Sequence, residues 1–63
     1  MENGAYMDLW TQRLVVTPTG RPGIVMGWVV DRLDILYTDP AGGTVMLHPN
    51  LIEVTDGRPR PAK

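Results

Sequence analysis

The sequence predicts an all-β domain, a small five-stranded barrel. Three observations lead to this fold class. Short apolar segments rich in β-branched residues recur along the chain, and several alternate apolar with polar positions, which is the period of a strand. Turns rich in proline and glycine separate these segments. No stretch has the length and the 3.6-residue period of a long amphipathic helix, so we expect strands to form the body of the domain.

The 63 residues suffice for one small domain. A domain of this size buries only about 60% of the surface that its unfolded chain exposes, and chains this short often need a disulfide, a metal or a partner chain. With 0 Cys and 1 His, the sequence excludes disulfides, thiolate metal sites and a multi-histidine zinc site within one chain. We therefore expect a protein partner, most simply further copies of the chain in a homo-oligomer.

The charge pattern argues against nucleic-acid binding by the body of the domain. The formal net charge is -1, and three of the six basic residues, Arg58, Arg60 and Lys63, lie in the last six positions. Domains that bind phosphate backbones usually carry a clear basic excess. Residues 1–12 lack the apolar run of a signal peptide, and no apolar segment approaches the length of a membrane span. We expect a cytoplasmic protein without membrane contact.

We divide the chain into a leader over residues 1–11, a barrel over residues 12–55 and a flexible tail over residues 56–63. The leader is polar, and we expect it to be flexible, with Tyr6 or Met7 docked on an apolar surface. A single helical turn over Tyr6–Trp10 is the alternative, although it is too short to be stable alone. The tail contains one glycine and two prolines, so we expect it to be disordered.

The first two strands are predicted at Gln12–Thr17 and Ile24–Val30. Alternate residues of the first face opposite sides, as in a half-buried strand. Pro18–Gly23 cannot continue a ladder and forms a loop. The second strand is apolar at both sets of alternate positions, so we expect both of its faces to be covered. Gly27 predicts a bend or a close backbone approach within it, and a tight turn at Asp31-Arg32 ends it.

The remaining strands are predicted at Arg32–Thr38, Thr44–His48 and Ile52–Val54. In the third strand Leu33, Ile35 and Tyr37 share one face. Asp39–Gly43 has strong turn chemistry and joins the third strand to the fourth. Pro49–Leu51 predicts a single 3₁₀ turn, because proline suits the first turn and three residues suit a short 3₁₀ piece.

Five short strands with a 3₁₀ turn before the last resemble the SH3-like barrel. Within that fold, Val15–Val54 is similar to the plasmid-encoded type II dihydrofolate reductases. The similarity is carried by Gly23–Trp28 and by Val45–Pro49. The resemblance implies small barrels that assemble as tetramers around one central pore, where NADPH and dihydrofolate meet.

The chain departs from the reductase pattern at the positions that line this pore. The family has Val-Gln-Ile-Tyr where this chain has Val45–His48, so that Met46 replaces glutamine and His48 replaces tyrosine. The pore lysine of the family falls near Thr17, and the first lysine of this chain is Lys63. The resemblance therefore implies the fold and the assembly rather than the reductase activity. We expect no cofactor, with NADPH only under the alternative of a divergent reductase.

His48 is the only imidazole, and it has the chemistry of a general base near neutral pH. A histidine at a strand end more commonly bonds to nearby backbone. A base also needs an orienting partner, for which Asp31, Asp34 and Asp39 are candidates. These three carboxylates are too widely spaced for a calcium loop. We predict no catalytic residue and no metal site.

The contacts of a binding surface are the remaining candidates. Aromatic side chains are enriched at interfaces because they bury large areas with few rotamers to fix. Trp28 and Tyr37 fit such an interface or the core. As the alternative, Trp10, Trp28 and Tyr37 could form an aromatic groove that receives a peptide or a stacked base. Met26 and Met46 fit a contact surface in the same way, because methionine adapts to irregular apolar surfaces. We predict a non-catalytic binding or assembly module that self-associates or docks in a larger complex. Its predicted contact residues are Trp28, Tyr37, Met46, His48 and Arg21.

Overall fold

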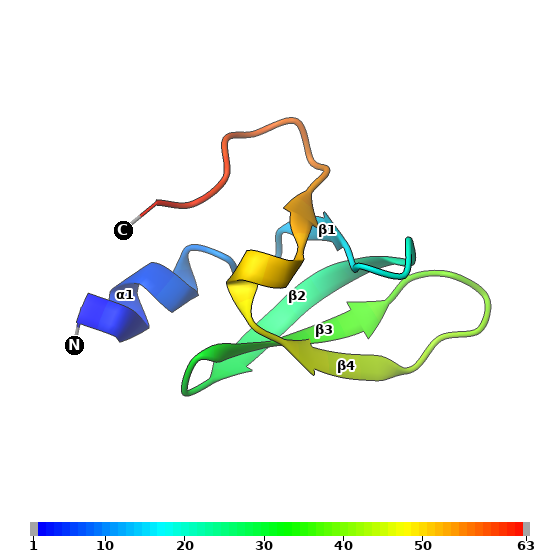
Figure 1. Cartoon of the computed structure of the whole chain (residues 1–63), viewed down its shortest axis with the longest axis horizontal. Helices are drawn as coiled ribbons and strands as arrows, with labels where there is room; N and C mark the ends of the chain where they lie inside the picture. Colours follow the sequence, from blue (N-terminus) through cyan, green and yellow to red (C-terminus); the bar gives the residue numbers. More distant parts are fainter. Residues whose placement is uncertain (1, 63) are drawn as a thin grey trace.

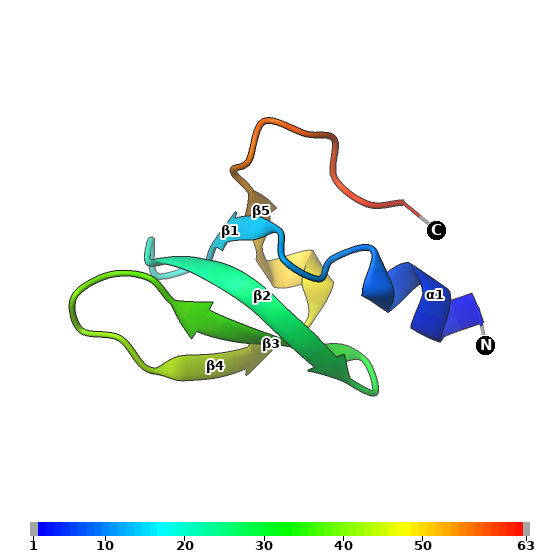
Figure 2. The same cartoon turned by 180° about the vertical axis from the view of Figure 1, so that it is seen from behind.

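All five strands of the protein join one antiparallel sheet, in the order β4-β3-β2-β1-β5 (Figures 1 and 2). The computed structural model describes residues 2–62. Its elements are α1 (Glu2–Asp8), β1 (Leu14–Val16), β2 (Pro22–Val29), β3 (Arg32–Tyr37), β4 (Thr44–Leu47), the 3₁₀ turn η1 (Pro49–Leu51) and β5 (Glu53–Val54). The predicted all-β class, with five strands and a 3₁₀ turn before the last, is confirmed.

The sheet has a buried inner face and an outer face. On the inner face Val25, Leu33 and Ile35 are fully buried, since alternate residues of β2 and β3 point to the same side. Val15 of β1 and Ile52 complete this side of the core. The predicted alternation of β3 is confirmed, because Leu33 and Ile35 are buried while the residues that alternate with them leave surface in water.

Two glycines of β2 have different roles. The register between β2 and β3 shifts between Val25 and Gly27, so β2 carries one extra residue there, which is a β-bulge. Gly27 follows the extra residue Met26 and has open space around it, so the predicted close backbone approach does not occur at Gly27. The close approach occurs instead at Gly23, where a Cβ would lie 2.6 Å from Ile35 Cγ2 and 3.0 Å from the carbonyl oxygen of Leu36.

The hairpin between β2 and β3 turns at Val30 and Asp31, one residue earlier than the sequence predicts. Val30 has a φ of 57°. This left-handed conformation is unfavourable for a β-branched residue, because Cβ comes close to the carbonyl oxygen. The tip of the hairpin is therefore strained at a residue that is 71% exposed.

Residues 2–8 form the helix α1 rather than a flexible leader. Met7 and the following Trp10 are almost completely buried, and both belong to the core cluster. A helix of seven residues is not stable alone, so its apolar contacts with the sheet hold it in place. Within residues 2–62 no helix is both long and apolar enough to traverse a bilayer.

The segment after β5 has no helix or strand, yet it is bonded to the domain, contrary to the expectation of a disordered tail. The guanidinium of Arg13 binds the carboxylate of Asp56 and donates to the carbonyl oxygens of Arg58 and Pro59. Arg60 donates further on, to the carbonyl oxygens of residues 52 and 49. Figure 1 shows this segment returning toward the side of the molecule that carries α1. Lys63 of the predicted tail lies outside the described residues.

Candidate functional site

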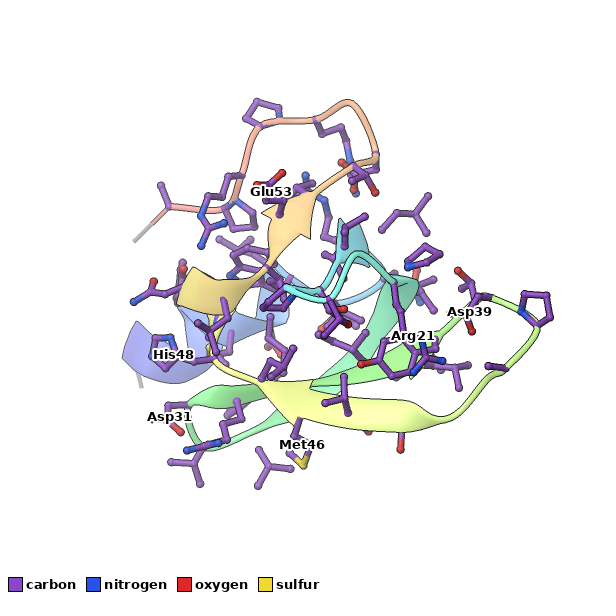
Figure 3. The ribbon with its side chains drawn as sticks, turned by 45° about the vertical axis from the view of Figure 1, so that its right-hand side comes forward. Arg21, Asp31, Asp39, Met46, His48 and Glu53 are labelled. Carbon is purple, nitrogen blue, oxygen red and sulfur yellow. The ribbon has the colours of Figure 1, made fainter. Side chains whose placement is uncertain are left out.

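The outer face of the sheet carries a set of exposed apolar side chains, which we call the outer apolar face. Its members are Leu14, Ile24, Met26, Val29, Leu36 and Met46. All but the partly buried Ile24 leave between 38% and 58% of their surface in water. Leu14, Ile24 and Leu36 are neighbours across three adjacent strands. Figure 3 shows Met46 pointing away from the body of the molecule.

 The pairing register of the strands, rather than the local sequence, brings the residues of the outer apolar face to one side of the sheet. Leu36 lies opposite Ile24 on β2 and Thr44 on β4, and the bulge at Met26 turns that side chain outward. The expectation that both faces of the second strand are covered is therefore not met within this chain, because Met26 and Val29 are exposed.

Two charged residues of β3 lie on this same face. Arg32 and Asp34 alternate with the buried Leu33, so both side chains point outward. Asp34 is opposite Met46 on β4 and Gly27 on β2, and its side chain makes no hydrogen bond or ion pair within residues 2–62. The only ion-pair partner of Arg32 in that part of the chain is its exposed neighbour Asp31, at 3.9 Å. Next to the outer apolar face, the described part of β3 thus presents the Asp34 carboxylate without a side-chain partner and the loosely paired Arg32 guanidinium.

Arg21 and Tyr37 are brought together at the other end of the sheet. The Arg21 guanidinium lies over the Tyr37 ring at 3.5 Å from its centroid. It also binds both carboxylate oxygens of Asp39, at 2.7 and 3.0 Å, and donates to the carbonyl oxygen of Gly42. These hydrogen bonds hold the pKa of Asp39 below its ordinary value, because they favour the ionised carboxylate. Figure 3 shows the two charged side chains meeting between two loops, so Arg21 acts there as a clasp.

Trp28 lies far from this clasp, on the inner face near α1. Its ring packs against the core cluster, and its Nε1 donates to a carboxylate oxygen of Asp8 at 2.7 Å. A Cβ at Gly4 would lie 3.4 Å from the ring, which shows how closely the helix covers it. Trp28 thus joins α1 to the sheet.

His48 is the N-cap of η1. Its Nδ1 accepts a hydrogen bond from the backbone N–H of Asn50 at 3.2 Å. Of the three carboxylates considered as orienting partners, Asp39 is bound to Arg21, and neither Asp31 nor Asp34 is bonded to the imidazole in the described residues. The geometry gives His48 a local structural role at the start of the 3₁₀ turn.

A second arginine clasp, formed by Arg13 and Asp56, joins the start of β1 to the segment that follows β5. Arg13 is 6% exposed, and its guanidinium binds both oxygens of the Asp56 carboxylate. These bonds lower the pKa of Asp56 and raise that of Arg13, because each partner favours the charged form of the other. Arg60 lies over the ring of Trp10, 4.9 Å from its centroid. The Trp10 Nε1 is the one buried side-chain nitrogen or oxygen of residues 2–62 without a hydrogen-bond partner.

Comparisons with protein-family models, with curated proteins and with solved structures found no significant match. The similarity to the type II dihydrofolate reductases stays a prediction. Of the two segments that carry this similarity, Val45–Pro49 is divided between two structural environments. Val45 and Leu47 pack against the core, whereas Met46 points outward and His48 caps η1.

The five predicted contact residues therefore occupy four places. Arg21 and Tyr37 share one clasp, whereas Trp28 lies beside α1, His48 caps η1 and Met46 belongs to the outer apolar face. The predicted contact residues did not include Leu14 or Leu36, whereas Met26 was expected beside Met46 on an adaptable apolar surface and does lie on the outer apolar face. An available signal was Leu36, an apolar residue at an outward position of the clearest strand.

Proposed function

We propose that this chain is an SH3-like barrel that acts as a protein-binding or assembly module through its outer apolar face. The strand order β4-β3-β2-β1-β5 and the 3₁₀ turn before β5 support the SH3-like assignment. The observation that carries the binding role is the outer apolar face itself. Contiguous exposed apolar patches on small soluble domains commonly mark interaction sites.

The other candidate residues support this choice of surface. Arg21 uses three of its five N–H groups within its own clasp, and Trp28 is partly covered by α1. Met46 is different, because its side chain is 41% exposed beside further apolar residues. Of the predicted contacts, Met46 therefore gives the strongest support to this proposal.

Photo-crosslinking in the cells that make the protein tests this proposal. A benzophenone side chain at position 46 should form covalent adducts with protein on illumination. The same group at Ala41, an exposed loop position between β3 and β4, is the matched control and should form few. Adducts from both positions equally, or from neither, would contradict a binding role for the outer apolar face.

A further inference from the structure

We infer that the outer apolar face binds a second copy of this chain, as a two-fold pair in which β3 lies antiparallel across β3 of the other copy. This inference rests on the proposed function and names the partner. Arg32 and Asp34 carry it, because they are opposite charges two residues apart on one face of one strand.

The positions of these charges select the arrangement. In a two-fold interface, a contact from residue i to residue j is accompanied by the contact from j to i. Suppose that the two β3 strands run antiparallel and that the two-fold axis crosses them at Leu33. Each Arg32 then lies over Asp34 of the second copy. A parallel arrangement would instead place each charge over its own kind. Stacked sheets are about 10 Å apart, a gap that two facing side chains can span.

The apolar residues fit the same arrangement. Leu36 is three residues from the level of the axis, so it would lie over the hairpin tip of the second copy, at Val30. Val30 is 71% exposed. Gly27, beside Asp34, has open space where a side chain would project, which leaves room for the incoming guanidinium. The pair would therefore cover apolar residues and pair the two charges at once.

The available area indicates a weak pair. A standard interface takes about 800 Å² from each partner. The chain exposes 4111 Å² in total, so such an interface would cover about a fifth of it. That requires the whole outer apolar face and its rim, rather than one or two side chains. We expect a dimer that dissociates on dilution through the micromolar range.

Sedimentation equilibrium of the full chain, with charge reversals, tests the inference. The wild-type chain should dimerise as its concentration is raised to about 500 µM. Arg32→Asp and Asp34→Arg should each weaken dimerisation at least about tenfold, because each reversal places like charges together twice. The double variant R32D/D34R should recover the wild-type affinity within about threefold, because the opposite charges face each other again.

Glu53→Arg is the matched control. It changes the net charge as Asp34→Arg does, and Figure 3 shows Glu53 on the side of the molecule opposite Met46. Its dimerisation should equal that of the wild type. Circular dichroism of each variant shows whether the fold is kept.

The results separate this inference from the proposed function. A wild-type chain that stays monomeric, or a dimer that does not respond to the reversals, overturns the second copy as the partner. If position 46 nevertheless crosslinks to a different protein, the binding role stands and only its partner changes. Loss of dimerisation in the Glu53→Arg control would also overturn the inference, because net charge would then be the cause.

Discussion

The two faces of the sheet differ most clearly along β3, where leucines three positions apart have different surroundings. Leu33 is 0% exposed and Leu36 is 38% exposed. Leu33 packs in the core cluster with residues from α1, β1 and β2, whereas Leu36 lies on the outer apolar face. The difference shows that this small chain has enough apolar residues for two surfaces but covers only one of them itself.

The largest expected effect comes from removing the buried leucine. Leu33→Ala should lower the free energy of unfolding by about 2–5 kcal/mol, because it leaves a cavity in the core. Leu36→Ala should cost less than about 1 kcal/mol. Urea denaturation at a protein concentration too low for association measures both. Equal losses would mean that the outer face is as well packed as the inner one.

A chain of this length has a total stability on the order of 5 kcal/mol. At the upper end of the expected loss, about 5 kcal/mol, Leu33→Ala would be substantially unfolded at 25 °C. Leu33→Val removes one methylene and should give an intermediate loss of about 1 kcal/mol. An unfolding midpoint for Leu33→Val equal to that of the wild type would contradict the assigned burial.

The next effect concerns the clasp formed by Arg13 and Asp56. The folded-state pKa of Asp56 is lower than its ordinary value of 3.8, so its contribution to stability is present above that pH. We expect this contribution to be lost progressively as the pH falls below about 4. Asp56→Asn should lower the melting temperature at pH 7 and flatten its fall in acid.

Asp39→Asn is the comparison for this prediction. It breaks the more exposed clasp, in which the arginine and aspartate side chains are 35% and 21% exposed, against 7% and 11% for Arg13 and Asp56. Solvent screens exposed ion pairs, so the loss at pH 7 should be smaller for Asp39→Asn. A larger loss would place the critical clasp at the loop end of the sheet.

The glycines of β2 offer a matched pair within one strand. Gly23→Ala should destabilise the protein by about 1–3 kcal/mol, because the added methyl group meets Ile35 and the backbone of Leu36. Gly27→Ala projects into open space and should change stability by no more than about 0.5 kcal/mol. Thermal unfolding of the two variants checks the difference. Similar melting temperatures would show that Ile35 and Leu36 can move to accommodate a methyl group at position 23.

The smallest expected effect is a gain at the hairpin tip. Val30→Gly should stabilise the protein by about 0.5–1 kcal/mol. Glycine adopts a positive φ without the steric penalty that valine has there, and its larger loss of entropy on folding offsets only part of this gain. Val30→Ala keeps the Cβ, so it should bring little of this gain. Chemical denaturation compares the two, and a destabilised glycine variant would show that the valine side chain has a compensating contact.

The sequence was sufficient for the strands because their cues are local. The alternation in Arg32–Tyr37, the turn chemistry of Asp39–Gly43 and the proline of η1 each act over a few residues. The role of α1 could not be predicted in the same way. Seven residues hold too weak a helical signal, and the burial of Met7 depends on strands that come later in the chain.

The candidate site was predictable only in part, for the same reason. Met46 is recognisable as an adaptable apolar residue, and Arg21 and Tyr37 as separate candidates. Their neighbours depend on strand register and on the bulge, which moves Met26 to the outside. The bond between Arg13 and Asp56 joins residues 43 positions apart, and no local pattern predicts it.

The Arg13 clasp has a consequence for the order in which the protein can fold during its synthesis. A growing chain presents this guanidinium early, but its acceptors arrive only with residues 56–59. Until then, closing the domain would bury a cation with nothing to neutralise it. Folding on the ribosome should therefore wait for those residues to leave the exit tunnel.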